Sequence, residues 1–164
     1  MLRKILAISS LISVTAMLPT TTHAATDTAA SSAVVLTPIT ITKTIDMSFG
    51  DMFPTAAAGT VVLGTDDSLT HTNVTAGPTG GTAATFTVGG SEGSTYAITL
   101  PANITLVSGG NNMIVDTFTH NAGGTPTIGV GGTSTLKVGG TLNVGATQAA
   151  GSYSVNFDVT VDYN

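Results

Sequence analysis

The side chains that could do chemistry are few in this chain of 164 residues, and they lie far apart. Histidine serves often as a general base and metal ligand, and it occurs as His23, His71 and His120. His71 and His120 each stand beside Thr or Asn, and neither belongs to a His-x-His or His-Glu-x-x-His pattern. Because the chain also has no cysteine, we expect no metal site and no catalytic site built on histidine.

Two glycine- or aspartate-containing segments have the composition of ligand-binding loops. Asp66 and Asp67 precede Ser68 and could supply oxygen ligands to calcium, but the alternating oxygens of a calcium loop are missing, so a turn is the first interpretation. The run 129–132, Gly-Val-Gly-Gly, resembles a nucleotide loop, yet Ser134 replaces the third glycine and no helix pattern follows. We therefore predict no cofactor and no enzymatic activity.

The charge balance limits the partners of the chain. Four basic residues stand against nine acidic ones, which gives a net charge of −5, and only 8% of residues are charged. Binding to a phosphate backbone depends on clustered cations, so we expect no nucleic acid partner. The mean hydropathy of +0.39 is too high for a disordered chain and favours a folded domain.

The first 24 residues have the three-part layout of a secretory signal peptide. Arg3 and Lys4 precede an apolar stretch over residues 5–18, and small residues around Ala24 form a cleavage site. The apolar stretch is shorter than the roughly 20 residues that span a bilayer. We predict a cleaved signal peptide over 1–24 and no transmembrane segment in the rest of the chain.

The remaining residues carry the pattern of an all-β protein. Short runs rich in Thr, Val and Ile alternate with Gly-Gly pairs, which is typical of strands joined by tight turns in a sandwich or barrel. An early strand covers residues 39–49, where Lys43 interrupts an apolar face. That charge protects a strand edge from wrong pairing or reaches water at the rim of the sandwich. The other expected strands span residues 60–63, 69–74, 84–88, 95–100, 112–119, 133–144 and 152–164.

Two of these runs alternate over more than ten residues. In 133–144 the apolar residues share one parity around Gly139 and Gly140, so we expect one long strand that bends or bulges at the glycines. In 152–164 every odd position is apolar or aromatic and every even position is polar, so one face must be buried. Its partners must come from earlier in the chain or from another molecule. The inward residues are Tyr153, Val155, Phe157, Val159, Val161 and Tyr163.

Four stretches together resemble a known family. They are ITITKT (39–44) with MSFG (47–50), TFTVGG (85–90) with TYAITLP (95–101), VGGTLNV (138–144), and AGSY (150–153) with VTVDYN (159–164). In this order the chain resembles the domain-of-unknown-function family 4402 of small secreted proteins from Gram-negative bacteria. That family is similar, more distantly, to fimbrial subunits of chaperone–usher systems and to spore coat protein U, whose cysteine pair this chain lacks.

The resemblance implies an immunoglobulin-like β-sandwich over residues 38–164 that is one strand short. In fimbrial subunits a periplasmic chaperone and then the N-terminal extension of the next subunit fill the resulting groove. Here residues Tyr153 to Tyr163 would flank the groove, and the extension over residues 25–37 would be the donor. Its apolar candidates are Ala33, Val34, Val35 and Leu36, a weaker set than a good donor strand shows. Folding back of the extension onto its own domain is the rival hypothesis.

Two functions follow as hypotheses from this resemblance and composition. The first is a non-catalytic structural subunit, pilus-like or coat-like, that is exported through the periplasm and assembles by β-strand addition at the cell surface or outside the cell. The alternative is a monomeric secreted binding module, adhesin-like, for a glycan or a surface protein. Three Tyr and no Trp offer little aromatic surface for stacking on a sugar.

Overall fold

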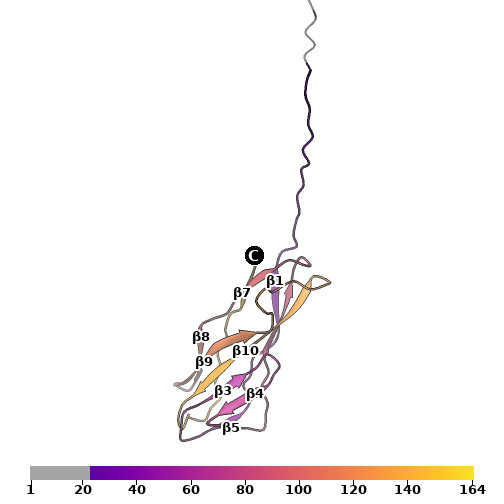
Figure 1. Ribbon diagram of the computed structural model, residues 1–164. Helices are drawn as coiled ribbons and strands as arrows, with labels where there is room; N and C mark the ends of the chain where they lie inside the picture. Colours follow the sequence, from indigo (N-terminus) through magenta and orange to yellow (C-terminus); the bar gives the residue numbers. More distant parts are fainter. Residues whose placement is uncertain (1–22) are drawn as a thin grey trace, which may run out of the picture. The chain divides into compact units, whose positions relative to one another are not determined.

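A computed structural model describes residues 23–164 of the protein (Figure 1). The predicted signal peptide therefore lies almost wholly outside the described residues. The chain divides into a unit that ends at Val34 and a second unit, Val35–Asn164, which we call the body. Residues 23–34 are exposed and contain no strand. No helix of the described residues is long and apolar enough to cross a membrane.

The described residues form eleven strands and no helix, and all strand pairs are antiparallel, which confirms the all-β prediction. The strands are β1 (Thr40–Ile45), β2 (Met52–Pro54), β3 (Gly59–Leu63), β4 (Leu69–Thr72), β5 (Val74–Ala76), β6 (Ala84–Gly89), β7 (Tyr96–Thr99), β8 (Asn103–Ser108), β9 (Asn111–His120), β10 (Thr133–Val144) and β11 (Thr160–Tyr163). Curled antiparallel sheets enclose the core, as expected for a β-sandwich. Figure 1 shows β1 and β7 at one end of the body and β3, β4 and β5 at the other.

Strand β10 organises the largest sheet. It pairs with β6 over Thr133–Val138, with β3 over Gly140–Val144, and with β9 in the region Val138–Asn143. The main path of the sheet is β1-β6-β10-β3-β4, and β8 joins it through β9. The β9–β10 register shifts between Gly139 and Thr141, so the predicted irregularity at the glycines is confirmed. A Cβ on Gly139 would lie 2.2 Å from the carbonyl oxygen of Leu63.

Two apolar clusters fill the body, and inward-facing side chains of β10 pack in both of them. Leu142 and Val144 pack in the first cluster, with residues of β3 and β9, while Leu136 and Val138 pack in the second, with residues of β6 and with Tyr96. All four β10 side chains are buried. The alternating pattern of 133–144 therefore predicted correctly which side chains face the core.

Several expected strand boundaries were wrong. The expected strand 152–164 forms a regular ladder only as β11, which pairs with β7, and before it Ser154 makes an isolated bridge to Val107. The expected strand 69–74 is interrupted at Asn73, whose φ of 53° separates β4 from β5. Strands β2 and β8 were not predicted, because β2 has three residues and β8 begins directly after Pro101 and Ala102.

The two ends of the body are tied together by hydrogen bonds. The hydroxyl of Tyr163 donates to the carbonyl of Thr37 at 2.6 Å and accepts the N–H of Ser91 at 2.7 Å. The N–H of Thr37 donates to the Ser91 hydroxyl at 2.6 Å. These three residues, which we call the Thr37 clamp, fix the place where the N-terminal residues join the body.

Candidate functional site

An apolar groove with a volume of about 990 Å³ opens in the body. One rim is the segment from Asp46 to Pro54, which follows β1 and includes β2. The other rim is the segment from Gln148 to Phe157, which precedes β11. We call these the first rim and the second rim. Neither rim forms a ladder with the other, and the groove lies between them.

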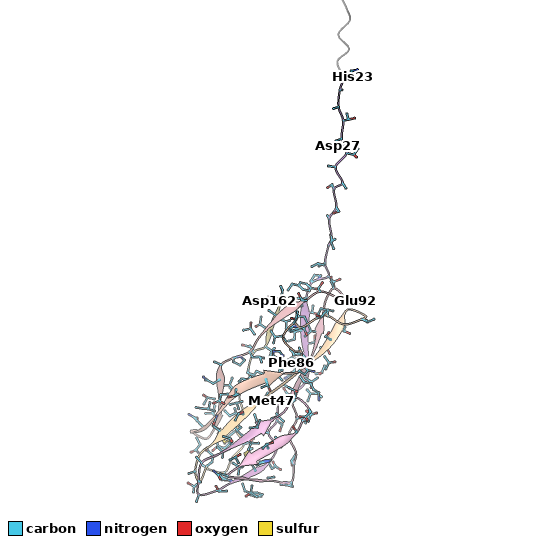
Figure 2. All side chains as sticks on the ribbon, in the orientation of Figure 1. His23, Asp27, Met47, Phe86, Glu92 and Asp162 are labelled. Atoms are coloured by element: carbon cyan, nitrogen blue, oxygen red, sulfur yellow. The ribbon has the colours of Figure 1, made fainter. Side chains whose placement is uncertain are left out.

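The floor of the groove consists of core side chains from both apolar clusters. Phe49, Met113, Val115, Leu142 and Val144 come from the first cluster, and Ala84 and Phe86 come from the second. Ile104 and Leu106 of β8 complete the floor. Met47 and Phe86, both labelled in the middle of the body in Figure 2, are two of the lining residues.

The first rim forms its backbone hydrogen bonds along the edge that faces away from the groove. Ser48 exchanges two backbone hydrogen bonds with Thr82, at 2.9 and 2.8 Å, and β2 pairs with β5. In an antiparallel strand the backbone groups of successive residues point to opposite edges. The backbone groups of Met47 and Phe49 therefore point to the groove side, and among the described residues they have no hydrogen-bond partner.

The second rim is arranged in the same way. Ser154 exchanges two backbone hydrogen bonds of 3.3 Å with Val107 of β8. Its neighbours Tyr153 and Val155 direct their backbone groups to the opposite edge, where the described part of the chain offers them no partner. The Tyr153 hydroxyl donates to the carbonyl of Ala149 at 2.8 Å and accepts from the Gln148 amide at 2.8 Å, which fixes this end of the rim.

Both rims thus present unused backbone donors and acceptors on either side of an apolar floor. A strand that entered the groove could pair with both rims and place alternate side chains on the floor. The charged residues of the lining already have partners: Lys43 forms an ion pair with Asp46, and Asp51 accepts a hydrogen bond of 2.6 Å from Thr79. The groove is therefore suited to an uncharged apolar strand.

The model of the domain of unknown function DUF4402 matches residues 39–163, which include all eleven strands. The chain belongs to the DUF4402 family. This confirms the family resemblance that the four sequence stretches predicted, while the more distant likeness to fimbrial subunits stays a prediction. Comparison of this DUF4402 protein with curated proteins and with solved structures gave no significant match.

The structure separates the six predicted groove residues of the DUF4402 domain into two groups. Tyr153, Val155 and Phe157 line the groove. The other three belong to the region beyond it: Val161 is buried in the second cluster, and Val159 and Tyr163 pack against that cluster. The division falls between Phe157 and Val159, just before β11 begins at Thr160.

The predicted donor residues Ala33, Val34, Val35 and Leu36 are all exposed, and none lines the groove. Val34 is 85% and Val35 is 95% exposed. Parts of the groove were also not predicted from the sequence. They include Met52 in the first rim and the β8 residues Ile104 and Leu106 in the floor. The alternation of β8 was a usable signal for the last two.

Lys43 lies on β1, the last strand on its side of the main sheet, and its side chain is 54% exposed beside Asp46. Both interpretations of this charge, protection of an edge and solvation at a rim, agree with that position. Lys43 also belongs to the lining of the groove.

Asp66 and Asp67, which were considered as calcium ligands, form hydrogen bonds within the fold. Asp67 accepts hydrogen bonds from Lys137 at 2.8 Å and from the N–H of Ala83 at 2.7 Å, and these interactions hold its pKa below the usual value. The Ser68 hydroxyl and N–H likewise lower the pKa of Asp66. The backbone of Thr65 and Asp66 forms a turn, in which the N–H of Asp67 donates to the carbonyl of Gly64 at 3.2 Å, and this confirms the turn interpretation. Among residues 23–164 no three His, Asp or Glu side chains gather as a metal site.

Proposed function

We propose that this DUF4402 protein is a non-catalytic structural subunit that assembles, in a pilus-like or coat-like manner, by accepting a β-strand from another chain. The observation that carries the proposal is the open groove, with an apolar floor and two rims whose facing backbone groups lack partners. An exposed strand edge of this kind favours pairing with another chain. No residue of the groove contributes to a catalytic arrangement in this proposal.

The energetics favour a strand as the occupant. Burial of one large apolar side chain contributes about 1.5–3 kcal/mol, so three or four such side chains on the floor would offset a large part of the ordering cost of a short peptide. The backbone of the same strand would form hydrogen bonds with Met47 and Phe49 on one rim and with Tyr153 and Val155 on the other. A compact ligand would leave most of those groups unpaired.

The export route belongs to the same proposal. The signal-like sequence of residues 1–24 favours secretion, and the family resemblance favours a route through the periplasm of a Gram-negative cell to the surface or the medium. An open apolar groove would be liable to aggregate during that passage. We therefore include a periplasmic chaperone that covers the groove until assembly.

A strand fused to the chain tests whether the groove is a strand acceptor. The fusion carries, after Asn164, a flexible Gly-Ser linker of about 12 residues and then a ten-residue strand with Val, Ile or Phe at alternate positions. We expect the melting temperature to rise by about 10 °C, since a net gain of a few kcal/mol shifts a domain of this size by that amount. A matched fusion with Ser or Thr at those positions serves as the control. Equal melting temperatures would contradict strand acceptance.

Assembly itself is tested in the cells that produce the protein. Complexes that survive unheated SDS gels and dissociate on boiling are expected for the natural chain, because strand-inserted complexes dissociate slowly. The fused chain, whose groove is filled, should migrate as a monomer. A natural chain that is monomeric throughout, and that binds a glycan on an array, would favour the binding-module alternative.

A further inference from the structure

The size of the groove sets a requirement on the strand that fills it. A cavity of about 150 Å³ holds one benzene-sized group, so 990 Å³ has room for about six such groups, including the backbone of the occupant. An extended strand directs only alternate residues to one face. The occupant must therefore present three or four large side chains on a single face.

The chain's own N-terminal extension does not meet this requirement. The apolar residues on one face of an extended strand are Ala30, Val34 and Leu36, and those on the other face are Ala25, Ala29, Ala33 and Val35. Each face thus has at most two apolar side chains larger than alanine, all within the last three positions before Thr37.

The Thr37 clamp adds a limit on reach. Thr37 is held through both its N–H and its carbonyl, and three extended residues span only about 10 Å. In a second copy, Val34, Val35 and Leu36 could reach a neighbouring groove only where the two bodies touched. The deeper part of that groove would receive alanines, serines and threonines.

The lining of the groove favours an occupant of variable sequence. Met47, Met52 and Met113 all line it, and they are the only methionines of residues 23–164. Methionine side chains are flexible and polarisable, and they adapt to partner side chains of different shapes. The ion pair of Lys43 with Asp46 leaves no unpaired cation in the lining to select an acidic strand.

We infer that the strand that completes this fold comes from a different protein, and that it presents at least three large apolar, uncharged side chains at alternate positions. This inference rests on the proposed function, because it names the partner of the same groove. The protein is then an acceptor in a mixed assembly, and its residues 25–37 are not the inserted strand.

Peptide binding to the full chain, as recovered after secretion, tests the inference. One 13-residue peptide has the sequence of residues 25–37, and a second alternates Val, Ile or Phe with Thr. A third has the composition of the second, with its apolar residues placed consecutively. We expect the alternating peptide to bind at least tenfold more tightly than the other two, as measured by calorimetry.

Two variants locate the binding. Val155 and Val62 are both valines with 43% exposure, but only Val155 lines the groove. Val155→Lys should weaken binding of the alternating peptide at least tenfold, and Val62→Lys should leave it unchanged. Equal losses in both variants would overturn the inference, because binding would then not be at the groove.

The remaining outcomes separate the inference from the proposed function. If the peptide of residues 25–37 binds as tightly as the alternating peptide, or more tightly, the donor is a second copy; the inference fails and strand acceptance stands. If no peptide binds and the fused strand gives no rise in melting temperature, the proposed function fails as well.

Discussion

Two twelve-residue stretches of this protein, Thr133–Val144 and Ser152–Tyr163, carry the same alternation of apolar and polar residues and have different structures. The first is β10, which is paired along its whole length and whose inward side chains are buried. The second forms a ladder only over Thr160–Tyr163, and Val155 is still 43% exposed. Alternation therefore determines which side chains turn inward, while the pairing depends on whether neighbouring strands exist.

The neighbours explain the difference. Strand β10 lies between β6 and β3 on the sheet path and also pairs with β9, so its backbone groups are satisfied within the chain. The second rim contacts β8 through Ser154 on one side and faces the open groove on the other. The unpaired stretch is consequently the part of the body where we propose that a strand binds.

Hydrogen exchange should show the largest contrast between the two stretches. The amides of Leu136 and Val138 are expected to exchange only through global unfolding, and thus about 10³-fold or more slowly than unprotected amides. Those of Tyr153 and Val155 should exchange within a few-fold of the unprotected rate. Mass spectrometry of peptic fragments measures both. Similar protection in the two stretches would show that the second rim is already paired, and a fused groove-filling strand should raise only its protection.

Substitutions of apolar residues should show the next largest contrast. Leu136 is fully buried in the second cluster, so Leu136→Ala is expected to lower the free energy of unfolding by about 2–5 kcal/mol. Val155→Ala shortens a side chain that is 43% exposed and should lower the free energy of unfolding by about 0.5 kcal/mol or less. Urea unfolding, with the denaturant slope checked for constancy, measures both values. A large loss for Val155→Ala would mean that the second rim is part of the closed core.

The bend in β10 can be tested by adding one methyl group. Because a Cβ on Gly139 would meet the Leu63 carbonyl oxygen at 2.2 Å, Gly139→Ala should destabilise the domain by about 1–3 kcal/mol. Gly124→Ala is the matched control, since a Cβ there meets nothing within 4 Å. Thermal unfolding of the two variants provides the measurement, and equal stabilities would show that β3 can move away from the glycine.

Much of the fold could be predicted from the sequence, because period-two alternation and glycine pairs depend on local geometry. The inward residues of β10 and the irregularity at Gly139 are examples. The extent of the ladder between β11 and β7 could not be predicted, since it depends on the position of β7, which lies about 60 residues earlier in the chain. For the groove, the alternation of the second rim predicted Tyr153, Val155 and Phe157, and these three residues line it. The alternation of β8 could have indicated Ile104 and Leu106 as inward-facing, but their place in the floor of the groove depends on the pairing of β8 with β9.

The smallest expected effect is the loss of folding stability at low pH when Asp67 is protonated. Lys137 and the N–H of Ala83 hold the pKa of Asp67 below its usual value of 3.8 in the folded state, so the ionised group stabilises the fold above that pH. The contribution is lost as the pH falls through the folded pKa. Asp67→Asn should therefore be less stable than the natural chain at pH 7, and the difference should shrink as the pH falls below about 4, through the lower folded pKa. Urea midpoints across this range measure it, with Asp158→Asn as a control, since Asp158 forms no ion pair within residues 23–164. A pH-independent difference would mean that Asp67 acts through its turn geometry, with φ of 67°, and that its charge contributes nothing.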